Sequence, residues 1–404
     1  PFFVEELLAS RTDSGSPLAT SLRDVLLARV AVLDAAAQHL LGVAAVGGRE
    51  VAHDELLAVA GSPAAETIAT LRSLVDAGLL VAASDPDRDG YAFRHALVHE
   101  AVYDDMLPTV RRSLHRAYGE VLLGDEQPSG DDAAKRIRLA NHWRAARDDR
   151  ALAASIEAGD AAMATYAFDI ATREYEEALL LWGPDDGDGD LGLDHVELLA
   201  RAGQATNMAA RDRRAADLFQ EALEELGPDG DAARRSELYG NVGFSLWVVG
   251  DRAGSVEAHE EAVRLAPDSD PKVRISALAG LARSYMLFGW FGRARPPCEQ
   301  AVELARSIGA RDLEGHALNT LGVTAFALKY RLPGEEGSPY TGDHVRQDAH
   351  RAVRLVRSRA DDFGVDPDRI GMLGFSAGGA VVLTIIFDPG DGDPQAPDSI
   401  DRVN

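Results

Sequence analysis

The stretch ARDRRAADLFQEAL, residues 210–223, recurs three more times in altered form, and this repeat decides which fold to expect. The other copies are YAFDIATREYEEAL (166–179), GDRAGSVEAHEEAV (250–263) and GWFGRARPPCEQAV (289–302). Each copy begins with a small residue or Tyr and has an Ala twelve positions later. A period of about 34 residues or somewhat more, with an Ala where two helices approach closely, is the tetratricopeptide pattern. The sequence therefore predicts a mainly α-helical protein with a tetratricopeptide-like solenoid over residues 151–325.

Such repeats have to stack, because one helix pair cannot bury its own apolar face. We expect the concave face of the stack to bind a protein, a peptide or a small ligand. The aromatic residues of the last copies fall at packing positions and are predicted to lie in the core. They are Trp247, Tyr285, Phe288 and Trp290.

The residues before the repeats predict a winged-helix-like domain over residues 1–119 and a helical connector over 120–150. Apolar residues at helical spacing indicate one helix near residues 22–33 and another over 64–77, which Gly78 ends. Two strands then follow around a DPDRDG turn, and helix, helix, hairpin is the outline of a winged helix. The second helix carries a single cation, Arg72, so we expect this domain to pack against protein and not to contact nucleic acid directly.

Charge and composition disfavour nucleic acid and membranes as binding partners. The chain has 41 Lys and Arg against 66 Asp and Glu, a net charge of −25 that repels nucleic-acid backbones and anionic lipid. Its one cysteine, Cys298, excludes an internal disulfide and fits a reducing compartment. The longest apolar run near the end, residues 380–387, is too short to cross a bilayer. We therefore expect a cytoplasmic protein with no membrane partner, and PFFVEELLAS without an initiator Met indicates a piece of something longer.

The first 325 residues resemble a known family. PFFVEELL (1–8), SLRDVLLARVAVLDAAAQHLL (21–41), YAFRHALVHEAVYDDMLP (91–108) and the repeats are similar to the arm that follows the ATPase core in LuxR-type signal-transduction ATPase regulators. The resemblance implies an ATPase module, which is expected but absent from these residues, since no G-x-x-x-x-G-K-[ST] loop occurs. It implies a signalling scaffold that senses a ligand or partner.

The pattern changes after the fourth repeat. Lys329 stands where the spacing calls for Gly or Ala, and a long helix over residues 344–363, a strand over 369–375 and another helix are predicted next. These elements predict a βαβα fragment of an α/β-hydrolase fold over residues 323–387, before a Pro/Gly/Asp-rich tail over 388–404. The text ALNTLGVTAF suits both a repeat helix and an esterase strand, so the junction could be natural or an artefact.

The candidate catalytic residues lie in GFSAGG, residues 374–379. G-x-S-x-G is the nucleophile elbow: Gly374 and Gly378 allow a tight strand-to-helix turn that presents Ser376 as the nucleophile. The N–H of Ala377, at the start of a helix, is placed to stabilise an oxyanion.

Residues 318–404 resemble the esterase branch of the α/β-hydrolases that includes acetyl-xylan and feruloyl esterase-like enzymes. The resemblance implies a carboxylesterase with Ser376 as nucleophile, but it also calls for an oxyanion loop, an acid and a catalytic His. The last histidine, His350, precedes the serine. Three alternatives stay open for the activity: an inactive segment on a binding scaffold, an esterase, or a serine that borrows a His from a partner chain. Whether the chain is an enzyme is therefore left undecided at this point.

Two further patterns suggest metal ligands, but we predict neither a metal nor a cofactor. The loop DGDGDLGLDHVE (186–197) spaces its oxygens like an EF-hand, yet Leu191 occupies the place that needs Gly. His95 and His99 lie one helical turn apart without an evident third ligand.

Overall fold

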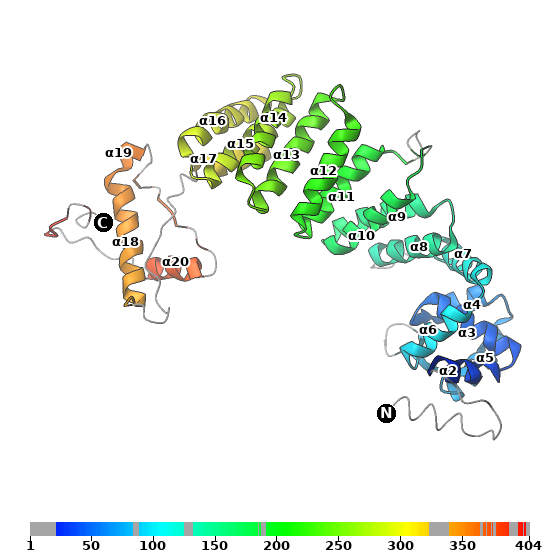
Figure 1. Ribbon diagram of the computed structural model, residues 1–404. Coiled ribbons are helices and arrows are strands. Elements are labelled where there is room, and N and C mark those ends of the chain that lie inside the picture. Colours follow the sequence, from blue (N-terminus) through cyan, green and yellow to red (C-terminus); the bar gives the residue numbers. More distant parts are fainter. Residues whose placement is uncertain are drawn as a thin grey trace. The chain divides into compact units, whose positions relative to one another are not determined.

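The computed structural model divides into two compact units, residues 1–321 and 322–404, which are described separately (Figure 1). The structure describes residues 22–83, 89–124, 132–184, 186, 191–322, 339–363, 367–368, 370–372, 374, 377–387, 395–398 and 400. It is mainly helical. Among these residues, no helix combines the length and the apolar character needed to span a membrane.

The N-terminal part of the first unit combines short helices with a small sheet. Its helices are α2 (Leu22–Ala31), α3 (Ala35–Gly47), α4 (His53–Ala60), α5 (Ala64–Asp76) and α6 (Ala96–Asp105). Its strands are β1 (Glu50–Ala52), β2 (Leu80–Ala82) and β3 (Gly90–Phe93). The sheet is antiparallel in the order β1-β3-β2, with Val51 opposite Tyr91 and Val81 opposite Ala92.

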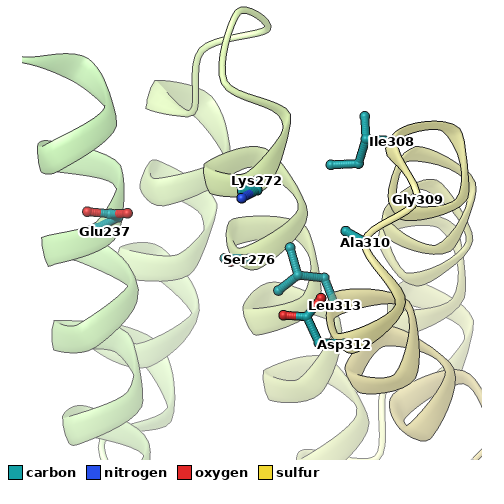
Figure 2. Close-up of a pocket in the computed structure, with 8 residues that line it drawn as sticks. All are labelled: Glu237, Lys272, Ser276, Ile308, Gly309, Ala310, Asp312 and Leu313. Carbon is teal, nitrogen blue, oxygen red and sulfur yellow. The ribbon is translucent and has the colours of Figure 1, made fainter.

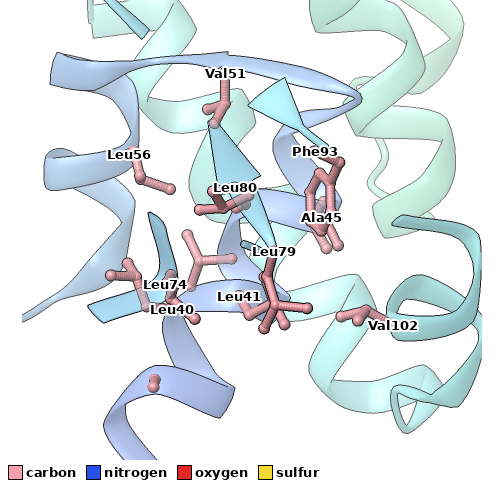
Figure 3. Packing of buried hydrophobic residues seen from close by; sticks show 14 of the residues in the cluster. Leu40, Leu41, Ala45, Val51, Leu56, Leu74, Leu79, Leu80, Phe93 and Val102 are labelled. Carbon is pink, nitrogen blue, oxygen red and sulfur yellow. The ribbon is translucent and has the colours of Figure 1, made fainter. Parts of the chain in front are cut away.

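The helix predicted over residues 64–77 is α5, and the predicted hairpin is formed by β2 and β3. Helix α5 ends at Asp76, and Gly78 follows with φ +68°, a left-handed conformation that suits glycine at the end of a helix. Strand β1 was not predicted, because a three-residue segment is too short to show an alternating pattern. The helices and the sheet share one core (Figure 3), in which Leu41, Leu56 and Leu74 are fully buried.

Helix α7 (Pro108–Gly124) links this core to the helical array that follows. Its Tyr118 lies in the N-terminal core and donates a hydrogen bond to the carbonyl of Val43 at 3.0 Å. The other side of α7 packs against α8 (Asp132–Ala146).

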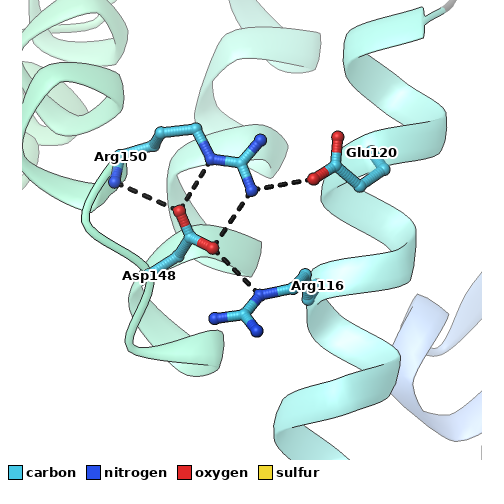
Figure 4. Close-up of polar contacts among 4 residues, drawn as sticks. All are labelled: Arg116, Glu120, Asp148 and Arg150. Carbon is cyan, nitrogen blue, oxygen red and sulfur yellow. Dashed lines mark hydrogen bonds and ion pairs between the residues drawn. The ribbon is translucent and has the colours of Figure 1, made fainter.

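A polar cluster at the turn after α8 fixes this junction (Figure 4). The carboxylate of Asp148 accepts from Arg116 Nε of α7 at 3.0 Å and from Arg150 Nε at 2.7 Å, and Arg150 also reaches Glu120 at 2.8 Å. The hydrogen bond from Arg150 is the main reason why the pKa of Asp148 lies below its usual range.

The helical array consists of antiparallel pairs that pack against their neighbours. Consecutive helices are in contact from α7 to α16, and the first helices of two successive pairs, α13 and α15, also contact each other. The remaining helices of this unit are α9 (Ala151–Ala164), α10 (Phe168–Leu181), α11 (His195–Met208), α12 (Asp212–Leu226), α13 (Ala232–Val248), α14 (Arg252–Leu265), α15 (Pro271–Leu287), α16 (Phe291–Ile308) and α17 (Arg311–Gly322).

The two positions that defined the repeat have a clear structural meaning. The first residue of each copy forms the tight turn between the two helices of a pair and has a positive φ: Tyr166 at +61°, Ala210 at +58°, Gly250 at +88° and Gly289 at +78°. The Ala twelve residues later is fully buried in every copy. These alanines are Ala178, Ala222, Ala262 and Ala301. The predicted tetratricopeptide-like repeat is therefore confirmed, and its start is a left-handed turn residue.

A second regularity places a small residue on the first helix against a larger one on the second, sixteen positions later. A Cβ added to Gly159 would lie 2.6 Å from the ring of Tyr175, and one added to Gly203 would lie 2.6 Å from the ring of Phe219. Gly243 lies against His259 in the same way. The absence of a side chain thus lets the two helices of these three pairs approach closely.

The second unit contains α18 (Gly342–Ser358), α19 (Ala360–Phe363) and α20 (Ala377–Phe387). The predicted long helix is interrupted at Arg359, and it begins two residues earlier than expected because Thr341 and His344 form a capping box. The strand predicted over residues 369–375 is wrong for its described part, since residues 370–372 and 374 are neither strand nor helix. A single strand has no partner to satisfy its backbone groups, and the described residues of this unit provide none. The first predicted strand falls in residues 323–338, outside the described residues.

Candidate functional sites

The predicted nucleophile elbow is only partly described. Ser376 lies outside the described residues, and Ala377 is the first residue of α20. Gly374 and Gly378 are brought together: a Cβ added to Gly374 would lie 2.1 Å from the carbonyl oxygen of Gly378. A side chain at position 374 would therefore clash with the backbone of Gly378, as expected for the first glycine of a G-x-S-x-G motif. The role of Ser376 as nucleophile stays a prediction.

A general base near the elbow is not evident among the described residues. His344 is engaged in capping α18, where its Nδ1 accepts from the backbone N–H of Thr341 at 3.0 Å. All the other histidines precede position 376 as well.

The acidic loop uses two of its carboxylates within the protein. Asp186 accepts from the N–H of Gly183 at 2.6 Å, and Asp194 caps α11 and pairs with Arg234 at 2.6 Å. Residues 187–190 of this loop lie outside the described residues.

His99 of the predicted pair His95 and His99 makes contacts within the protein. His99 Nε2 hydrogen-bonds to the carbonyl of Ala45 at 2.9 Å, and its ring packs edge-on against Phe93. In the described part of the chain, no three His, Cys, Asp or Glu side chains gather to hold a metal ion.

The repeats carry a hollow of about 400 Å³ that sequence reasoning missed (Figure 2). Glu237 of α13 lies on one side of it, and Lys272 and Ser276 of α15 lie in the middle. The turn between α16 and α17, together with Asp312 and Leu313 of α17, closes the other side. The carboxylate of Glu237 forms no hydrogen bond or ion pair with any described residue. Partial burial, followed by the nearby carboxylates of Asp270, Glu197 and Asp231, raises the pKa of Glu237.

Two turns further along the same helices lies an aromatic group with a cation. The rings of Phe244 and Trp247, both on α13, have centroids 5.7 Å apart, and the guanidinium of Arg283 on α15 lies 5.1 Å from the Phe244 centroid. Both aromatic residues are half-buried and Arg283 is exposed.

The prediction that the repeat aromatics are core residues holds only in part. Tyr285 is buried, whereas Trp290 is 42% exposed. Trp247 lies between these extremes and faces the same side as Arg283. The pattern in the sequence cannot separate these cases, because a ring at the rim of a helix pair has the same spacing as a buried one.

Similar proteins are found only among solved structures. No protein-family model matches the chain, and no curated protein matches it either. Among solved structures, the apo form of RapI has a TM-score of 0.42 at 10% identity, covering 95% of this chain and 89% of that one. The Rap conjugation gene regulator of plasmid pLS20, solved with a peptide, has a TM-score of 0.38 at 13% identity, covering 87% and 94%.

A third similar structure is a signal transduction ATPase with numerous domains and a tetratricopeptide repeat sensor, from Pyrococcus horikoshii. Its TM-score is 0.29 at 13% identity, and the match covers 85% of this chain and 60% of that protein. The chain therefore spans less than two thirds of that protein's length. The assignment of a helical-repeat fold rests on the helix pairs, the turns and the buried alanines described above.

Proposed function

We propose that this chain is mainly a binding scaffold whose tetratricopeptide-like repeats receive a protein or a peptide. The observation that carries the proposal is the surface formed by α13 and α15. It presents a carboxylate without a partner among the described residues, an exposed arginine and two half-buried aromatic rings, whereas the nearby Arg274 and Arg293 are paired. Residues that remain unsatisfied in the free protein are available to a partner.

We further propose that the N-terminal part is a winged-helix-like domain that packs against protein. Its order of elements, α3-β1-α4-α5-β2-β3 with a terminal hairpin, supports this. Arg72 is the only basic residue of α5, which also carries Glu66 and Asp76. A recognition helix for DNA needs several cations to contact phosphates, so this helix is better suited to a protein partner.

The larger setting that we propose is a cytoplasmic regulator of the LuxR-type signalling ATPase class, in which an ATPase module works with this arm. The resemblance of residues 1–325 supports this setting. The repeats would then sense the partner and pass its presence to the ATPase.

Selection from a phage-displayed library of random 12-residue peptides on the purified chain tests the scaffold function. We expect selected peptides, resynthesised with a fluorescent label, to bind in solution. If no peptide binds more tightly than a Gly/Ser peptide of equal length, the repeats are not a peptide-binding scaffold.

A second candidate function is ester hydrolysis by Ser376. The close approach of Gly374 to Gly378 favours a true elbow geometry. Because the chain lacks a His after the serine, we propose that this segment is inactive by itself.

A further inference from the structure

The hollow and the aromatic group belong to one surface. Glu237 and Phe244 of α13 are seven residues apart, and so are Ser276 and Arg283 of α15. Seven residues make slightly less than two helical turns, so both members of each pair lie on the same side of their helix, about 10 Å apart. Since α13 packs against α15, the four residues and Trp247 line one strip, here called the α13–α15 surface.

Arg283 stands out among the arginines nearby. Arg274, on the same helix, pairs with Asp268 at 3.1 Å, and Arg293, on the next helix, pairs with Glu260 at 3.2 Å. Arg283 has neither an ion pair nor a hydrogen bond with any of the described residues, and its contact is with the face of Phe244. Protein atoms crowd its guanidinium, and this partial desolvation lowers the pKa of Arg283 although the side chain still reaches solvent.

A close approach of the helices beneath this point accounts for the crowding. The ring of His259, from α14, fits between Gly243 of α13 and Gly280 of α15. Without side chains at these two glycines, α13 and α15 lie near one another, and Arg283 lies over the face of Phe244, whose ring in turn contacts Trp247. Such a preorganised cation loses little conformational freedom when it binds an anion.

We propose that Arg283, Phe244 and Trp247 bind a carboxylate-bearing, extended peptide segment, with the Asp or Glu side chain on Arg283 and an adjacent apolar side chain on the two rings. This inference rests on the proposed scaffold function and specifies its ligand. The planar guanidinium donates two parallel hydrogen bonds to a carboxylate, and the rings offer apolar area beside it. The remaining segment runs toward the hollow, a distance that about three extended residues cover.

The charges around this point favour a carboxylate over a phosphate. At the other end of the surface Glu237 and Asp312 outnumber the one cation of the hollow, Lys272, and the chain as a whole carries a net charge of −25. One unpaired arginine in this field compensates a single negative charge, whereas the phosphate of a phosphopeptide brings nearly two and a nucleic acid brings one at every nucleotide. A nucleic acid or a phosphopeptide is therefore disfavoured.

The test starts from the selected peptides and measures affinity by fluorescence anisotropy. We expect each of them to carry an Asp or Glu next to an apolar residue. Arg283→Gln should weaken binding about tenfold or more. Arg295→Gln should leave it unchanged, because Arg295 lies on α16 and pairs with Glu299 of its own helix. Circular dichroism verifies that both variants are folded.

A double-mutant cycle makes the test specific. Replacing the peptide's acidic residue by its amide should weaken binding to the native chain but not to Arg283→Gln, because the two changes remove the same contact. If the two losses simply add, or if Arg283→Gln binds normally, the carboxylate site is overturned while the scaffold function stands. If no peptide binds at all, both proposals fail. Preferential binding of phosphopeptides or of single-stranded DNA would also overturn the inference.

Discussion

At the scale of the residue, His259 shows how a single substitution within a repeat creates sensitivity to acid. It occupies the position that Tyr175 and Phe219 hold in the preceding pairs, and it is 1% exposed. Its Nδ1 donates to the carbonyl of Ser255 at 2.9 Å. Burial lowers the pKa of His259 to about 4, although this hydrogen bond partly opposes the effect.

We predict that this residue makes the repeats less stable in mild acid. In the unfolded chain a histidine has a pKa of about 6.5. Below that pH the unfolded state binds a proton at this residue and the native state does not, so acid favours unfolding. The contribution is fully present above pH 6.5 and is lost as the pH falls toward the native pKa of about 4, by at most ~1.4 kcal/mol per pH unit. His259→Phe should flatten urea-unfolding free energies measured between pH 7 and pH 4.5.

The buried histidines His115 and His142 also make the protein less stable in acid, and this effect is the same in the native chain and in His259→Phe. Burial also lowers their pKa values, to about 4 and about 3, so the native chain and the variant should both retain this part of the acid loss. An unchanged pH slope in His259→Phe would show that His259 is not buried as a neutral ring.

Gly203 lies so close to Phe219 that there is no room for a methyl group at this position. In Gly203→Ala the new Cβ would lie 2.6 Å from the ring of Phe219, so either the ring or the helix has to shift. We expect a loss of about 1–3 kcal/mol in the free energy of unfolding, measured with urea. Gly292→Ala, on α16 with nothing within 4 Å of the new Cβ, is the matched control and should be neutral or stabilising by about 0.5–1 kcal/mol. Equal losses in both variants would contradict the packing described here.

At the scale of the element, one buried carboxylate holds three helices together. Glu174 of α10 is fully buried and accepts a short hydrogen bond from Arg144 of α8. The same guanidinium group donates to Ser155 of α9 at 2.8 Å. The ion pair therefore fixes the stacking of α8, α9 and α10.

Removing this charge should be far more harmful than removing an exposed one on the same helix. Glu174→Gln leaves Arg144 with an uncompensated charge at a nearly closed site, and we expect a loss of about 3–5 kcal/mol. Glu176→Gln breaks only the exposed 3.4 Å pair with Arg214 and should cost about 0–1 kcal/mol. Thermal unfolding of the two variants side by side checks the difference, and similar melting temperatures would argue against a structural role for the buried pair.

The elements that could be predicted from the sequence are those with a repeated local signal. The turn residues and the alanines twelve positions later recur four times, and their spacing reports helix packing directly. The turn at Arg147, which also has a positive φ of +54°, escaped prediction because the residue there is Arg and the residue twelve positions later is Gly159.

The α13–α15 surface could not be predicted, and the reason is physical. Phe244 and Arg283 are far apart in sequence and become neighbours only when α13 packs on α15. Which arginine lacks a partner also depends on every carboxylate around it. At the elbow, a Cβ added to Gly374 would lie 2.1 Å from the carbonyl oxygen of Gly378, but the strand expected before it is not found at residues 370–372 and 374.

At the scale of the whole molecule, the excess of acidic residues bears on every charged ligand. With a net charge of −25, the chain repels a peptide that carries many carboxylates, so one well-placed acid should bind better than a run of them. The same field slows association with nucleic acid.

The hydrolase segment gives the last prediction, which concerns the chain as an enzyme. A serine attacks an ester only after a base has taken its proton, and the base has to lie within hydrogen-bond reach. No His follows Ser376 in these 404 residues, and His344 caps α18. The purified chain and its Ser376→Ala variant should therefore hydrolyse p-nitrophenyl acetate at the same rate as buffer.

A rate that is well above background and lost in Ser376→Ala would show that another group acts as the base. The dependence on protein concentration then locates that group. If the rate per chain is constant, the base belongs to the same chain, and the conclusion drawn from the missing histidine is wrong. If the rate per chain rises with concentration, the base comes from a second copy, since only association can bring a distant histidine within reach of Ser376.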